Sequence, residues 1–132
     1  MKHKLILCLA LVLSGGLLGC STATHHSAIK VPREATASEC ERLYLAWHQE
    51  CERIGYSSNT YDYIGLPSYR KIVAIDKPAL PFLEHKMVQD KGLDFMLAFA
   101  VVEICGWDRQ EFRGGSEQDF RDKVLKKLRA NQ

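Results

Sequence analysis

The sequence predicts an all-α protein, in which residues 38–132 fold as a compact bundle of four or five helices. Two observations support this fold class. Apolar residues recur at spacings of three and four, which is the pattern of helices that bury one face. Helix-capping residues precede these stretches, and glycine or proline separates them from one another.

The first helix is predicted to begin near Ser38, because Ser38 and Glu41 form a capping-box pair, and to end at Gly55. Its apolar stripe consists of Cys40, Leu43, Tyr44, Trp47, Cys51 and Ile54. Residues 55–67 contain three tyrosines and are predicted from their composition to form a loop.

Two helices are predicted between this loop and the most apolar part of the chain. A short helix covers residues 67–75. Asp76 is placed to cap a further helix, in whose first turn Pro78 and Pro81 are tolerated. The buried side of that helix is predicted to consist of Leu80, Leu83, Met87 and Val88.

Residues 92–107, GLDFMLAFAVVEICGW, are predicted to contain the central core helix. Asp94 can cap this helix and Gly106 can terminate it. Its length of about 16–18 Å is too short to span a bilayer, so a helix apolar on every side is one buried within a domain. The last helix is predicted to begin at the capping box of Ser116 and Asp119 and to bury Phe120, Val124, Leu125 and Leu128.

Residues 72–106 combine an apolar helix end, a helix start with two prolines, a short turn and an Ala-rich apolar helix that ends in glycine. This pattern resembles one unit of a HEAT-like helical repeat. HEAT solenoids stack several units, and the sequence contains no second copy, so we expect a HEAT-like hairpin inside a compact domain. The resemblance implies protein interaction rather than catalysis.

The N-terminus has the layout of an export signal, with two lysines before an apolar run over residues 5–13. The run is about half the length of a membrane helix. It leads to the sequence LLGC at 17–20, which resembles the lipobox of bacterial lipoproteins. The resemblance implies that residues 1–19 are removed as a signal peptide and that Cys20 receives fatty acyl chains such as palmitate. Several chains hold a protein at a membrane stably, whereas one chain does not.

The lipobox resemblance implies a membrane-anchored protein of the bacterial cell envelope. The alternative is an ordinary secreted protein that is cut near Gly19. In Gram-negative lipoproteins, a residue other than Asp after the cysteine accompanies sorting to the outer membrane. If the source is Gram-negative, Ser21 therefore implies an outer-membrane protein that faces the periplasm. Residues 20–37 carry little apolar pattern and are predicted to form a flexible tether.

Three cysteines remain once Cys8 leaves with the signal peptide and Cys20 is acylated. In an oxidising compartment, Cys105 is predicted to pair with Cys40 or Cys51, and buried free thiols are the alternative. Cys40 and Cys51 cannot pair with each other within one helix. About 16 Å of helical rise separates them, and a disulfide tolerates about 7 Å between Cα atoms.

Glu103 is the one acid in the apolar residues 95–105 and is predicted to be a buried carboxylate. Such a group must be paired, hydrogen-bonded or protonated. A structural hydrogen bond is the favoured role, and a general acid with a raised pKa is the alternative. His48, Cys51 and Glu52 occupy neighbouring positions on the first helix, which suits metal ligation in principle, although their spacing matches no known zinc site.

The mature chain is electrically neutral, because Lys2 and Lys4 of the signal account for the formal net charge of +2. This balance argues against nucleic acid as a partner and against electrostatic adhesion to anionic lipid. The sequence contains no phosphate-binding loop, serine nucleophile elbow or zinc-protease motif, and it indicates neither an enzyme nor a cofactor. We therefore expect an accessory module that binds another envelope protein. The alternative is a small envelope enzyme or metal-binding protein that uses His48, Cys51 and Glu52 with Glu103.

Overall fold

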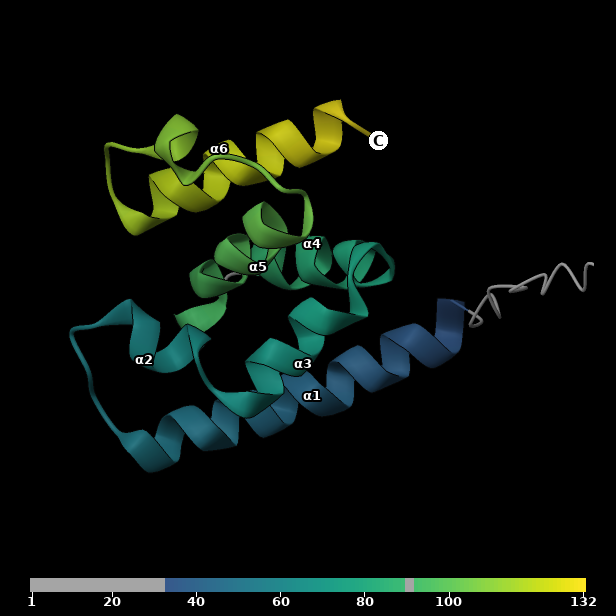
Figure 1. The fold of residues 1–132 in the computed structure, drawn as a ribbon, viewed down its shortest axis with the longest axis vertical. Coiled ribbons are helices and arrows are strands. Elements are labelled where there is room, and N and C mark those ends of the chain that lie inside the picture. Colours follow the sequence, from purple (N-terminus) through teal and green to yellow (C-terminus); the bar gives the residue numbers. More distant parts are fainter. Residues whose placement is uncertain (1–32, 90–91) are drawn as a thin grey trace, which may run out of the picture.

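The computed structural model describes residues 33–89 and 92–132, which form helices joined by short turns (Figure 1). The predicted signal peptide, Cys20 and residues 20–32 of the predicted tether lie outside the described residues. The elements are α1 (Arg33–Ile54), α2 (Thr60–Ile64), α3 (Pro67–Ile75), the 3₁₀ helix η1 (Lys77–Ala79), α4 (Leu80–Gln89), η2 (Gly92–Met96), α5 (Leu97–Ile104), η3 (Arg109–Phe112) and α6 (Glu117–Ala130). The prediction of an all-α bundle is confirmed, with six α-helices in the described part rather than four or five.

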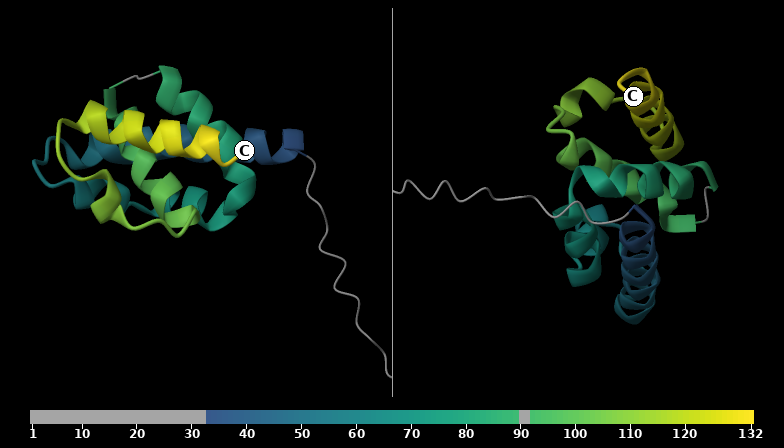
Figure 2. Two further views of the ribbon diagram at one scale, coloured as in Figure 1. Left: turned by 90° about the horizontal axis from the view of Figure 1, so that it is seen from above. Right: turned by 90° about the vertical axis from the view of Figure 1, so that its right-hand side faces the viewer.

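The helices are arranged in three layers (Figure 1). The long helix α1 packs against α3 in the first layer, and α4 and α5 lie against each other in the middle. Helix α6 covers the far side of α5. The start of α1 and the end of α6 lie at the same end of the molecule, as the turned views show (Figure 2).

The core is built on the apolar stripe of α1, most of which is buried as predicted. The buried members are Cys40, Leu43, Tyr44, Trp47 and Cys51, whereas Ile54 is exposed. The indole Nε1 of Trp47 donates a hydrogen bond of 3.0 Å to the Tyr63 carbonyl, which joins α1 to α2. The hydroxyl of Tyr69 donates to the Met96 carbonyl at 2.7 Å, which joins α3 to η2. These bonds satisfy polar groups that would be costly to bury alone.

Helix α1 begins at Arg33, five residues before the predicted start at Ser38. Residues 33–37 of the predicted tether are therefore helical. Arg33, Glu34 and Ala35 have good helix propensity, and the acid of Glu34 in the first turn complements the helix dipole. The predicted capping pair at Ser38 lies inside the helix, because the local Ser/Glu spacing does not require a helix end.

The predicted loop at residues 55–67 contains the five-residue helix α2. Asn59 caps it, because the Asn59 side-chain oxygen accepts a hydrogen bond from the Tyr61 amide at 3.2 Å. A helix this short has no apolar periodicity that a sequence pattern can detect. Tyr63 on this helix is buried, and its hydroxyl donates to the Gly55 carbonyl at 3.0 Å.

The predicted helix at residues 67–75 is confirmed as α3. Asp76 does not cap the next helix with its side chain, and its backbone turns at a φ of 65° into η1. Helix α4 buries Leu83 and Met87 as predicted. Val88 is 55% exposed, so its assignment to the buried side is wrong.

The apolar segment 92–107 starts with the 3₁₀ helix η2 before it continues as α5. Its central position in the core is confirmed by the complete or nearly complete burial of Leu97, Ala98, Ala100, Val101 and Val102. Asp94 lies within η2 and does not cap α5, so that prediction is wrong. No helix in residues 33–89 and 92–132 is both long and apolar enough to cross a membrane.

The predicted capping box of α6 is confirmed. The Ser116 hydroxyl accepts from the Asp119 amide at 3.2 Å, and the Asp119 carboxylate accepts from the Ser116 amide at 2.6 Å. The apolar stripe of α6 buries Val124, Leu125 and Leu128 against the middle layer. These contacts fix the position of the C-terminal turn of α6, which forms one wall of the groove described below.

Candidate functional site

Glu103, the predicted buried acid, lies at the surface at the end of α5, with 37% of its side chain exposed. The prediction is wrong because Glu103 projects away from the face of α5 that carries Val101 and Val102 into the core. Arg70 donates from Nη1 and Nη2 to the two carboxylate oxygens at 2.8 and 2.5 Å. This pairing lowers the pKa of Glu103, so the carboxyl is ionised at neutral pH and is poorly suited to act as a general acid.

The buried acid of the segment is Asp94, which has no exposed surface. The Tyr44 hydroxyl donates to Asp94 Oδ1 at 2.7 Å, and Nε2 of His48 lies 3.4 Å from the same oxygen. Burial, with the adjacent Asp94, raises the pKa of Tyr44, so Tyr44 remains a donor. Asp94 was predicted from the sequence to cap a helix. Two sequence features are consistent with its burial: its apolar neighbours Leu93 and Phe95, and the i, i+4 pair of Tyr44 and His48, which can face one acid.

His48, Cys51 and Glu52, which are neighbours on α1, line one hollow of about 380 Å³, but their side chains do not converge on a common point. Burial raises the pKa of Cys51 to about 11, which keeps the thiol protonated and unsuited to nucleophilic attack at neutral pH. Among the residues that the structure describes, no three His, Cys, Asp or Glu side chains gather as metal ligands. Glu103 pairs with Arg70 and does not line this hollow, so it does not complete a site with His48.

Cys40, Cys51 and Cys105 are free thiols in the structure, and the predicted disulfide is not formed. Cys40 and Cys51 point into the core from α1, whereas Cys105 follows α5 and lines a different hollow from Cys51. Burial raises the pKa of Cys40 to about 11 and also raises the pKa of Cys105. All three thiols are therefore protonated at neutral pH, and they fill space as small apolar side chains do.

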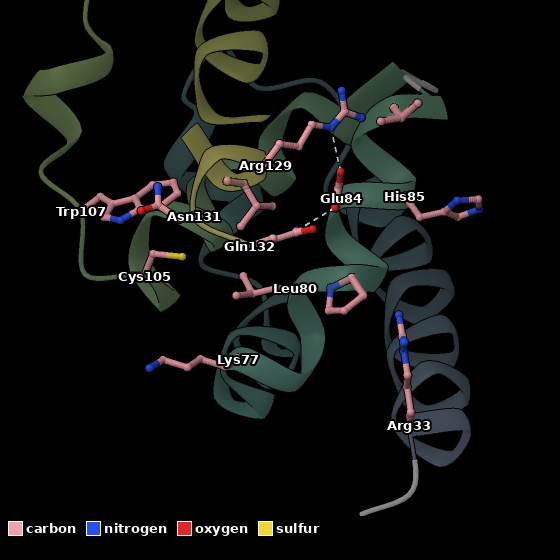
Figure 3. A pocket seen from close by; sticks show the side chains of 13 residues that line it. Arg33, Lys77, Leu80, Glu84, His85, Cys105, Trp107, Arg129, Asn131 and Gln132 are labelled. Atoms are coloured by element: carbon pink, nitrogen blue, oxygen red, sulfur yellow. Dashed lines mark hydrogen bonds and ion pairs between the residues drawn. The ribbon is translucent and has the colours of Figure 1, made fainter. Parts of the chain in front are cut away.

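A hollow of about 850 Å³ lies between α4 and the C-terminal end of α6 (Figure 3). We call it the α4–α6 groove. Helix α4 contributes one continuous face to it, made of Leu80, Pro81, Glu84, His85 and Val88. The opposite wall and the ends are Arg33, Lys77, Cys105, Trp107, Leu128, Arg129, Asn131 and Gln132.

The apolar residues of helix α4 lie in two different environments. Leu83 and Met87 are fully buried in the core, while Leu80 and Val88 project into the groove. Sequence reasoning placed all four residues on one buried side. The two faces can be separated only when α6 is known to cover part of α4, which is tertiary information.

Glu84 connects the two walls of the groove (Figure 3). Its carboxylate accepts from Arg129 Nε at 2.8 Å and from the Gln132 side-chain amide at 3.0 Å. The hydrogen bond from Arg129 has the larger effect and that from Gln132 the next, and both lower the pKa of Glu84. Glu84 therefore holds the end of α6 against α4 as an anion, and its charge is already compensated.

Arg33 and Lys77 stand at the rim of the groove, and neither forms an ion pair within the described residues. In Figure 3, Lys77 and Arg33 lie at opposite sides of the lower part of the view, and Trp107 and Asn131 lie on the same side as Lys77. The groove thus combines apolar surface and an aromatic side chain with two uncompensated cations. This composition is suited to binding another molecule by burial and charge, and the groove contains no activated nucleophile.

No protein-family model matches the chain, and neither curated proteins nor solved structures give a significant match.

Proposed function

We propose that this protein is a lipid-anchored component of the bacterial cell envelope that binds another envelope protein through the α4–α6 groove. One observation carries this proposal. The groove has a volume of about 850 Å³, and it joins an apolar floor to a charged rim. Interfaces of this kind have an apolar centre surrounded by polar groups.

The anchor is supported by the N-terminal sequence. Two lysines, a short apolar run and the sequence LLGC at 17–20 together resemble a lipoprotein signal. Acylation of Cys20 would hold the domain at the membrane surface, facing the periplasm if the source is Gram-negative.

The interaction role is also supported by the resemblance of residues 72–106 to a HEAT-like repeat unit. This segment holds α4, η2 and α5, and α4 packs against α5 and η2. Helical hairpins of that type present one helix face to a partner. Here the available face is the one with Leu80 and Val88.

Photo-crosslinking in intact envelopes tests the proposed binding function. A photoreactive amino acid at Val88, in the groove, is expected to capture one discrete protein. The matched control is the same amino acid at Leu45, which is similarly exposed at 53% but lies on α1 away from the groove. Capture of the same proteins from both positions, or of none from Val88, would contradict the proposal.

Fractionation tests the anchor separately. Replacement Cys20→Ser removes the thiol that is proposed to be acylated, and the protein is then expected in the soluble fraction. Continued membrane association of Cys20→Ser would show that the anchor is not a lipid on Cys20.

A further inference from the structure

The rim of the α4–α6 groove is cationic although the mature chain is neutral overall. Its charged lining residues are Arg33, Lys77 and Arg129 on the basic side and Glu84 alone on the acidic side. Because Glu84 is bonded to Arg129 and Gln132, the charges of Arg33 and Lys77 have no counterpart within the described structure. The groove therefore offers two free positive charges to a ligand.

The floor of the groove follows one helix and has the spacing that a second helix requires. Leu80, Glu84 and Val88 repeat at intervals of four residues along α4. Apolar side chains at i, i+4 of a docked helix can pack between such rows. Val88 is 55% exposed in the free domain, so its apolar surface remains available for burial.

The position of the groove also limits where its ligand lies. Arg33 is the first residue of α1 and lines the groove. Twelve residues separate it from Cys20, and an extended chain over these thirteen residue-to-residue steps reaches at most about 45 Å. If Cys20 is acylated, the groove remains close to the membrane surface.

We propose that the α4–α6 groove receives an acidic amphipathic helix from a membrane-proximal part of the partner protein. Its apolar residues pack on Leu80 and Val88, and its carboxylates face Arg33 and Lys77. This inference rests on the proposed function and specifies the chemistry of the partner. A second copy of the chain is a poorer occupant, because a symmetric contact through this groove brings the two cationic rims together. An anionic membrane is also poorer, because the apolar residues line a recess rather than a protruding surface.

The test uses the full acylated protein in phosphatidylcholine nanodiscs, with a photoreactive amino acid at Val88. The probes are two synthetic helices with the same leucine stripe, one with glutamates and the other with lysines at its polar positions. The acidic helix is expected to crosslink about tenfold more than its basic twin at low salt, because each charge near the rim is attracted rather than repelled.

Charge reversal gives the decisive variant. The double substitution Arg33→Glu with Lys77→Glu is expected to abolish or invert the preference for the acidic helix. It should not impair folding, because an acid in the first turn of α1 suits the helix dipole and Lys77 is exposed. The control is Lys71→Glu with Lys126→Glu, which makes the same change in net charge at exposed positions outside the groove and should leave the preference unchanged.

Each other outcome overturns the inference. Equal crosslinking of both helices would show that charge does not select the ligand. Capture of lipid at Val88 after phosphatidylglycerol is added, with loss of the peptide crosslink, would make the groove a lipid site. The proposed function is judged independently from the envelope crosslinking, so a captured protein that presents no acidic helix refutes this inference alone.

Discussion

Asp94 and Glu103 lie nine residues apart in one apolar segment, yet the protein treats the two carboxylates in opposite ways. Asp94 is fully buried near the start of the segment, where the Tyr44 hydroxyl and the His48 imidazole lie against its carboxylate. Glu103 lies at the end of α5, where 37% of its side chain meets solvent and Arg70 binds both of its oxygens. The comparison separates a buried hydrogen-bonding group from a surface ion pair.

The two environments carry different energetic consequences. A buried carboxylate is tolerated only while donors satisfy it, so each of its bonds matters for folding. The charges of a solvent-exposed ion pair are well solvated in the unfolded state, so their pairing in the folded state adds little to the free energy of unfolding. The position of an acid in the fold, rather than its apolar neighbours in sequence, therefore decides its importance to stability.

The largest effect is expected from Asp94→Ala. This change removes the acceptor of the Tyr44 hydroxyl and leaves that buried group unsatisfied beside a small cavity. We expect a loss of about 2–4 kcal/mol in the free energy of unfolding, measured by urea denaturation followed by circular dichroism. A loss below about 0.5 kcal/mol would mean that the buried cluster does not stabilise the fold.

A smaller loss, about 1–2 kcal/mol, is expected from Tyr44→Phe, which removes the donor and keeps the ring. The aromatic packing of Tyr44 on His48, with centroids 4.4 Å apart, is retained in this variant. In the double variant with Asp94→Ala, the tyrosine change should add little, because the bond is already lost. Additive losses would indicate that the two groups act separately.

Much of the fold could be predicted from the sequence because helical periodicity reports burial directly. The apolar stripe of α1, the bounds of α3 and the capping box of α6 are local patterns, and the structure contains all three. The early start of α1 at Arg33 and the short helix α2 were missed. Neither segment has an apolar repeat long enough to be recognised as helical in the sequence. Packing stabilises both segments.

The sites were harder to predict because they depend on which elements meet. The apolar neighbours of Glu103 in the sequence led to the prediction that it is buried. Its actual partner, Arg70, is 33 residues away in sequence. Asp94 meets Tyr44 across 50 residues. The α4–α6 groove likewise exists only because the end of α6 reaches Glu84, a contact over 45 residues that no local pattern encodes.

Glu103→Gln should have a small effect, below about 1 kcal/mol, because exposed ion pairs are screened by water and salt. The variant keeps the shape of the side chain and one hydrogen-bond acceptor for Arg70. The same urea titration in low and high salt should show that even this difference shrinks as the salt concentration rises. A loss as large as that of Asp94→Ala would contradict the distinction between the two acids.

The smallest predicted effect is the pH dependence of the stability difference between wild type and Glu103→Gln. Arg70 holds the pKa of Glu103 below its ordinary value of 4.5, so the folded state binds this proton less readily than the unfolded state. The contribution of Glu103 is therefore complete well above pH 4.5 and disappears as the pH falls through the lowered folded-state pKa. Wild type and Glu103→Gln should differ in stability near pH 7 and converge as the pH falls through the lowered folded-state pKa of Glu103. Divergence on acidification would mean that the folded protein favours the protonated acid, which is the behaviour expected of a buried carboxyl rather than of this surface pair.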